Sequence, residues 1–200
     1  MPGQSAFAPA PLPKLGRMKG AGTTYYSQPG LFVYSSTAFL NLAGNKDHYW
    51  PILINSPIVV DQFAFEVSAL VAGGNARVGL YVADTDWQPV GGPLADSGSI
   101  SIASTGVKTY TPATAISLSA GRYVLSYCQD DATFTAALRS LSSSSVVGPV
   151  RDVFSSSPFV QYLTVARTYA AFPTPGTPWD APVFGGTGFI CPVAFRISQP

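Results

Sequence analysis

The scarcity of charged residues is the feature that most constrains the fold of this chain. Charged residues make up 10% of its 200 residues, against roughly 25% in an average globular domain. One glutamate and four lysines leave few of the residues that normally cover exposed helix faces. Glycine (19) and proline (18) are abundant instead, and both favour turns. The composition therefore predicts an all-β protein without helical layers.

Alternating hydrophobicity indicates where the strands lie. In residues 57–70, Phe63, Phe65 and Val67 share one face and polar residues lie between them, as in a half-buried strand. Similar short segments separated by turn residues predict roughly eight to ten strands. The eleven strand-like segments from which these strands are expected are residues 31–39, 49–54, 57–70, 77–82, 94–102, 107–111, 115–118, 122–129, 133–138, 160–171 and 189–197. We expect an antiparallel two-sheet β-sandwich, jelly-roll-like, over residues 23–200.

Residues 1–22 differ in composition from the rest of the chain. They contain four prolines, four glycines and no acidic residue, which predicts an extended or polyproline-like N-terminal arm. Its basic residues, Lys14, Arg17 and Lys19, are candidates for docking on an acidic protein surface. A tail with a few solubilising charges is the alternative.

Charge and hydropathy exclude several classes of partner. Beyond the arm there are eight basic and ten acidic residues, too few basic groups to hold nucleic acid through its phosphates. We expect no membrane span, because no stretch of about 18 apolar residues occurs. The first residues also lack the pattern of a secretory signal. Cys128 and Cys191 lie in strand-like segments and are expected to be buried free thiols of a reducing cytoplasm, although a disulfide between adjacent strands stays possible.

Few residues suggest catalysis or metal binding. His48 is the one histidine, and no catalytic motif of known spacing occurs, so we expect neither an enzyme nor a metal or cofactor site. The acidic pairs Asp84/Asp86 and Asp130/Asp131 suit glycoside hydrolysis or calcium binding in principle. Capping of turns is the favoured interpretation, because aspartate is a common turn former.

The aromatic residues are more informative. Three Trp, ten Tyr and twelve Phe exceed what a core of this size clearly needs. Flat rings beside acids and amides suit sugars, which have apolar faces and hydroxyl edges. The candidate glycan-binding residues are Trp87, Tyr49, Trp50, Trp179, Asp84 and Asp86. The alternative is that each tryptophan closes an end of the sandwich or packs in an oligomer interface.

Two stretches carry a resemblance to known proteins. They are ARVGLYVADTDWQPVGGPLADSGSIS at 76–101 and ISLSAGRYVLSYC at 116–128. Together with the Pro-rich loop before the final PVAFRI, they resemble the β-sandwich domains of bacteriophage virion proteins, especially tail fibres, spikes and head fibres. The likeness is one of pattern and brings no catalytic residues with it.

The resemblance implies a structural protein of the virion, assembled in the host cytoplasm. The expected form is a homo-oligomer, with a trimer favoured, whose arm joins other virion proteins and whose loops bind a host cell-surface polysaccharide. A capsid decoration or head-fibre protein without a receptor role is the first alternative. A secreted carbohydrate-binding module is the second.

Overall fold

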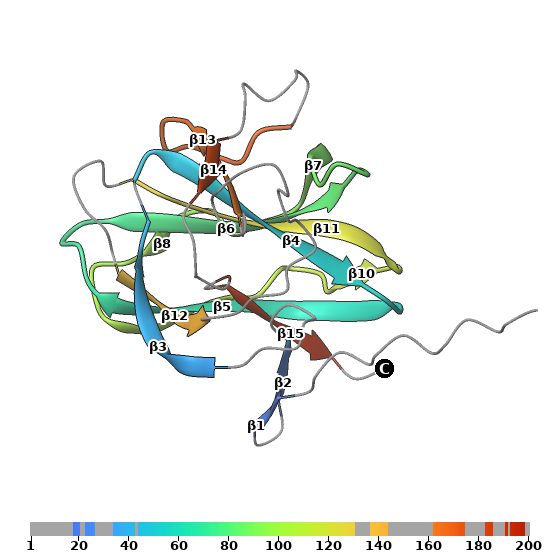
Figure 1. Ribbon diagram of the computed structural model, residues 1–200, viewed down its shortest axis with the longest axis horizontal. Helices are drawn as coiled ribbons and strands as arrows, with labels where there is room; N and C mark the ends of the chain where they lie inside the picture. The colour runs from blue at the N-terminus through green and yellow to red at the C-terminus, as the bar shows by residue number, and fades with distance from the viewer. Residues whose placement is uncertain are drawn as a thin grey trace, which may run out of the picture.

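The computed structural model describes residues 18–20, 23–26, 34–42, 44–130, 137–143, 162–174, 183–185, 191 and 193–198. Side chains are described for residues 42, 44–130, 164–174, 191 and 193–198. These parts of the chain contain strands and no helix, and the strands form two antiparallel sheets stacked as two layers (Figure 1). The all-β sandwich expected from the sequence is confirmed, and its jelly-roll character stays a prediction. None of the described segments forms a helix that could cross a membrane.

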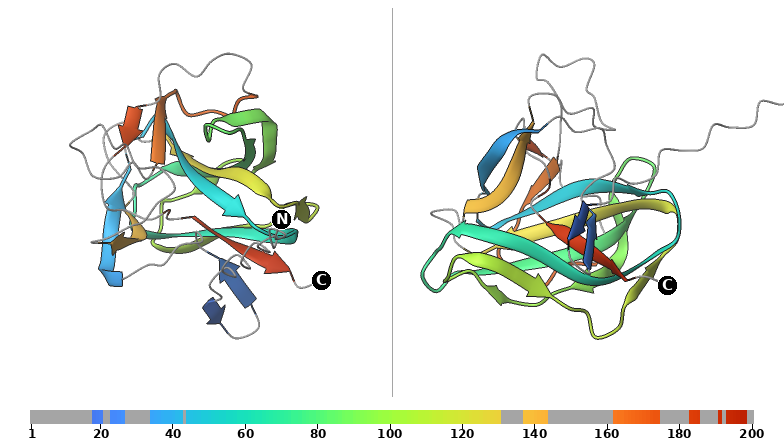
Figure 2. Two further views of the ribbon diagram at one scale, coloured as in Figure 1. Left: turned by 45° about the vertical axis from the view of Figure 1, so that its right-hand side comes forward. Right: turned by 90° about the horizontal axis from the view of Figure 1, so that it is seen from below.

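The first layer is built around the long strand β5 (Ile58–Ala69), and we call it the β5 sheet. Its strand order is β1 (Met18–Gly20), β2 (Thr23–Tyr26), β15 (Ala194–Ser198), β5, β12 (Ala137–Ser143) and β3 (Tyr34–Asn41). The other edge of β5 pairs with β9 (Gly106–Tyr110) and β10 (Ile116–Leu118). The β1–β2 hairpin lies beside β15 (Figure 2).

The second layer is built around β11 (Gly121–Gln129), and we call it the β11 sheet. Its strand order is β14 (Val183–Gly185), β13 (Tyr162–Ala166), β4 (Lys46–Ile54), β11, β6 (Asn75–Ala83) and β7 (Pro89–Asp96). The short strand β8 (Ile100–Ser101) also pairs with β6. Strands β4 and β6 flank β11 over most of its length.

The main core lies between the two sheets and follows the alternation read from the sequence. Phe63, Phe65 and Val67 of β5 are buried in it, as expected. A register shift beside Arg196 marks a bulge in the pairing of β5 with β15. Because Asp61 is the extra residue there, Val60 and Phe63 both point into the core. Arg196 closes the bulge with an ion pair to Asp61.

Within the arm that the sequence predicts to be extended or polyproline-like, Met18–Gly20 form strand β1 and pair with β2, so Lys19 lies in an extended strand. Lys14 and Arg17 fall outside the described residues. A single strand was expected at 160–171, but β13 ends at Ala166 and the chain then crosses the sheet without strand pairing.

Candidate binding surface

The tight loop between β6 and β7 presents Trp87 at one end of the β11 sheet. The Trp87 amide donates a hydrogen bond to the Asp84 carbonyl (3.3 Å), and the Asp84 amide donates to the Gln88 carbonyl (2.9 Å). The Asp84 Oδ1 atom accepts hydrogen bonds from the amides of Asp86 (2.8 Å) and Gln88 (2.9 Å). Asp84 therefore caps the loop, as the favoured interpretation of the acidic pair predicted.

The backbone of Trp87 is strained. Its φ of 63° lies in the left-handed region, which residues other than glycine, asparagine and aspartate rarely adopt. The position closes the loop after the turn that begins at Asp84, a place where glycine is usual. The half-buried indole ring packs against Arg122, whose Cζ atom is 5.5 Å from the ring centroid. Strain of this kind is maintained by the surrounding hydrogen bonds, and it is common at binding sites.

Arg122 connects the loop to the sheet. It is an exposed residue near the start of β11, and it lies directly opposite Leu53 of β4, which is 41% exposed. Among the arginines whose side chains are described, Arg77, Arg167 and Arg196 form ion pairs with aspartates, whereas Arg122 has none with the described residues. We call Trp87, Arg122 and Leu53 the Trp87 surface.

The opposite end of the same sheet face is covered. Residues 167–174, which we call the strap, run across it and insert Phe172. A second small core forms beneath the strap, outside the main sandwich. Its buried members are Tyr49, Tyr81, Val124, Cys128 and Phe172.

Arg167 holds the strap to β4. Its guanidinium donates to both carboxylate oxygens of Asp47, which is 1% exposed, and the Nη2–Oδ1 distance is 2.8 Å. The same guanidinium donates to the carbonyls of Ala170 and Ala171, and the hydroxyl of Tyr49 donates to Asp47 at 3.0 Å. The buried charge is therefore paired and hydrogen-bonded, as a stable buried ion pair requires.

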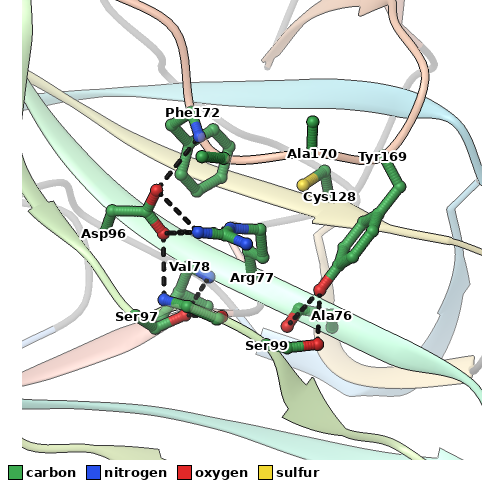
Figure 3. Close-up of polar contacts among 12 residues, drawn as sticks. Ala76, Arg77, Val78, Asp96, Ser97, Ser99, Cys128, Tyr169, Ala170 and Phe172 are labelled. Carbon is green, nitrogen blue, oxygen red and sulfur yellow. Dashed lines mark hydrogen bonds and ion pairs between the residues drawn. The ribbon is translucent and has the colours of Figure 1, made fainter.

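Asp96 of β7 makes the second attachment of the strap (Figure 3). It accepts hydrogen bonds from the side chain of Arg77 and from the amide of Phe172, each at 3.0 Å. The hydroxyl of Tyr169 hydrogen-bonds with Ser99 and donates to the carbonyl of Ala76. The charged groups at this end thus fasten the strap to the sheet.

The structure separates the predicted glycan-binding residues. The expectation that Tyr49 and Trp50 lie in or beside loops is wrong, because both are buried within β4, one under the strap and one in the main core. Their rings offer no exposed face to a sugar. Asp86 is exposed in the loop that carries Trp87. Trp179 lies outside the described residues.

The remaining candidate residues for metal binding or catalysis take part in packing or in hydrogen bonds within the fold. Among the described residues, no cluster of three or more His, Cys, Asp or Glu side chains could hold a metal ion. Asp130 accepts hydrogen bonds from the amide and side chain of Asn75, and Asp131 lies outside the described residues. His48 is buried and stacks on Trp50.

The two cysteines are free and buried, as expected. Burial raises the pKa of the Cys191 thiol to about 12. The pKa of Cys128 is also raised, first by burial and then by the charge of Asp47. Both thiols are therefore protonated at neutral pH, and neither supplies the thiolate that a nucleophilic cysteine needs.

Sequence reasoning missed Arg122 and the strap residues. An arginine directly after a glycine, at the start of the apolar strand 122–129, was the available signal for Arg122, but its contact with Trp87 is not local in the chain. No protein-family model matches the chain, and no curated protein or solved structure is significantly similar to it. The function is therefore inferred from the residues and their geometry.

Proposed function

We propose that this protein is a non-catalytic structural protein of a bacteriophage particle, a tail fibre, spike or tail-tip component. It assembles as a homo-oligomer, joins the particle through its N-terminal arm, and presents the Trp87 surface to glycans on the host cell. The resemblance of residues 76–101 and 116–128 to phage appendage domains supports the setting. The raised pKa values of both thiols support a role without nucleophilic chemistry.

The observation that carries the assembly part is the edge strand β9 of the β5 sheet, with its exposed Val107. Within the described part of the chain, β9 pairs with β5 and with no other strand. Val107 of this edge strand is 66% exposed. An unpaired edge with an exposed valine is a ready surface for a neighbouring strand. Other large hydrophobic side chains are exposed as well, namely Leu53, Leu70, Val82, Val90 and Leu94.

Sedimentation of the full-length protein tests this assembly. We expect a trimer at micromolar concentration, and we expect Val107→Asp to shift it toward monomer, because the charge would be buried against the partner. Ser56→Asp, which adds the same charge at an exposed turn, is the matched control and should leave the oligomer intact. A wild-type protein that stays monomeric at about 100 μM, far above the dissociation constant of a stable assembly, would refute the homo-oligomer.

Electron microscopy tests the place of the protein on the particle. Antibodies against the purified protein should label the tail of the phage that encodes it. Label on the capsid would replace the fibre role with that of a decoration or head-fibre protein. Particles that carry no label would exclude any virion role and would favour a secreted carbohydrate-binding module.

A further inference from the structure

We infer that the Trp87 surface binds an acidic saccharide, a sugar whose ring carries a carboxylate. Trp87 and Leu53 supply apolar contacts for the sugar ring, and Arg122, which lies over the Trp87 ring, is the partner of the carboxylate. The inference deepens the glycan-binding part of the proposed function and names the class of sugar. It rests on the Trp87 surface alone and needs no particular oligomer.

The first observation is the state of Arg122. Three of the four arginines with described side chains already donate to aspartates, at Asp96, Asp47 and Asp61. Arg122 is exposed, has no acidic partner among the described residues, and is held over the Trp87 ring. A planar guanidinium with free donors binds a carboxylate through two parallel hydrogen bonds. Arg122 is therefore available for an acid supplied by a ligand.

The second observation is the strained backbone of Trp87. A tryptophan with φ of 63° occupies a loop position where glycine is usual. The hydrogen bonds of Asp84 hold the loop in this conformation. Because strained backbone positions cluster at ligand-binding sites, the strain at Trp87 points to this loop and its indole as the binding feature. A tryptophan face suits the apolar face of a sugar ring.

The two groups form one composite site. Because the Arg122 Cζ atom lies over the indole, 5.5 Å from the ring centroid, a ligand anion bound to Arg122 lies beside the ring. Leu53, directly opposite Arg122, extends the apolar floor. One sugar can therefore place its carboxylate on Arg122 and its carbon framework on the apolar groups.

The local charge favours a singly charged sugar over a phosphate. Asp86, the exposed residue before Trp87, adds a negative charge to the loop and offers oxygens to sugar hydroxyls. Asp84 of the same loop accepts hydrogen bonds from backbone amides and has no basic partner among the described residues, so Arg122 faces two carboxylates and the local net charge is about −1. Such a site disfavours multiply charged phosphates and nucleic acids, which need several basic groups.

Titration with paired probes tests the inference. The probes are oligomers of galacturonate, glucuronate and N-acetylneuraminate, each compared with its uncharged methyl ester. We expect at least one acid to bind, and its ester to bind at least about tenfold more weakly because the charge-assisted hydrogen bonds are lost. Isothermal titration calorimetry on the full-length protein measures both affinities, and inorganic phosphate serves as the simple-anion control.

Two variants and one control show whether the acid binds at the Trp87 surface. Arg122→Gln removes the charge, and Trp87→Gly removes the ring while suiting the backbone of the loop. Each should weaken binding of the acid at least about tenfold. Arg122→Gln should also abolish the preference for acid over ester. Lys46→Ala, which removes an exposed charge at the other end of β4, should leave the affinity unchanged.

Each contrary result overturns the inference. Equal affinity for acid and ester would mean that the surface recognises neutral sugar only. Affinity for phosphate equal to that for the acid would mean a general anion site. Loss of binding in Lys46→Ala, or absence of binding to every acid at millimolar concentration, would leave the Arg122–Trp87 pair as a packing contact. The sedimentation and labelling results do not depend on the sugar, so the virion proposal can stand if this inference fails.

Discussion

The two ends of the outer face of the β11 sheet use the same residue types in opposite ways. At one end the strap covers the strands, and Arg167 and Arg77 are paired with Asp47 and Asp96. At the other end Arg122 and Trp87 lie against each other at the surface. Strands β4, β6 and β11 extend through both ends. The presence of the strap, and not the strands themselves, therefore decides which arginines stabilise the fold and which are available to a ligand.

Burial explains why the arginines at the covered end are paired. An unpaired charge beneath the strap would lose its hydration without compensation. The carboxylate of Asp47 is compensated by Arg167 and by the hydroxyl of Tyr49. Arg122 is exposed and keeps its hydration, so an acidic partner adds little to stability there. The comparison predicts that equivalent substitutions at the two ends have very different effects.

The largest effect is expected for Arg167→Ala. It leaves the buried carboxylate of Asp47 without its partner and releases the strap, which should lower the free energy of unfolding by about 3 kcal/mol. Urea unfolding measures this loss. Arg122→Ala is the matched control at the open end and should cost less than about 0.5 kcal/mol. Similar losses for the two variants would show that the two ends do not differ as described.

Cysteine reactivity shows whether the strap has opened in Arg167→Ala. Cys128 lies under the strap, with its Sγ atom 4.0 Å from the Arg167 guanidinium, whereas Cys191 lies in the main core. Iodoacetamide should label neither thiol in the native wild-type protein. In the variant it should label Cys128 and spare Cys191, as mapped by mass spectrometry. Equal labelling of both would indicate global unfolding and not release of the strap.

The next effect is expected at Gly79, where the strap packs most closely on β6. A Cβ atom added there would lie 2.6 Å from Ser126 Oγ and 2.8 Å from a ring carbon of Phe172. Gly79→Ala should therefore displace Phe172 and cost about 2 kcal/mol. Gly92→Ala is the control, because its added Cβ meets only Thr174 Oγ1 at an ordinary 3.5 Å. Wild-type stability in Gly79→Ala would mean that Phe172 does not need this contact.

The sequence predicted the inner layer of the fold well and the strap poorly. In β5, one face meets the core and the other stays partly exposed, so alternation revealed Phe63, Phe65 and Val67. Strand β4 is buried on both faces, by the core and by the strap, and alternation around Tyr49 and Trp50 is lost. These residues were placed near loops because burial by a distant segment has no local periodicity.

The sequence predicted only some residues of the candidate site. Trp87 was identified because a flat ring beside acidic and amide residues suits a sugar, and Asp84 was correctly expected to cap a turn. Arg122 was not identified, because strand pairing across the sheet brings it to Trp87. The left-handed backbone of Trp87 also has no signature in the sequence, since the glycine that normally marks this position is absent.

An effect of pH, separate from the effects of the strap substitutions, tests the depth of burial of the thiols in both cores. The pKa of Cys191 is raised from 9.0 to about 12 by burial, so the unfolded chain loses this proton first as the pH rises. The stability due to the buried thiol is fully present below pH 9 and is lost as the pH rises toward 12. The slope is about 1.4 kcal/mol per pH unit for each such thiol. Urea unfolding between pH 9 and 11 should show this fall.

Cysteine variants show which thiol causes the loss of stability at alkaline pH. Cys191→Ala should have a shallower slope than the wild type, and Cys128→Ala should behave likewise, since the pKa of Cys128 is raised as well. An unchanged slope in Cys191→Ala would mean that its thiol ionises equally in the folded and unfolded chains. An unchanged slope in Cys128→Ala alone would mean that the strap opens before the thiol titrates, which would make the covered end less stable than the main core.

The smallest effect is expected at Trp87, where replacing the residue with glycine, and not replacing a glycine, is the favourable change. At Gly79 a new methyl group has no space, whereas at Trp87 it is the backbone conformation that disfavours a side chain. Trp87→Ala loses the contact with Arg122 and keeps the strain, and Trp87→Gly loses both. The glycine variant should therefore be more stable than the alanine variant by about 1 kcal/mol, measured by urea unfolding. Equal stabilities would mean that the loop relaxes once the indole is removed, and that contact of the ring with Arg122, not the Asp84 cap, holds the left-handed backbone.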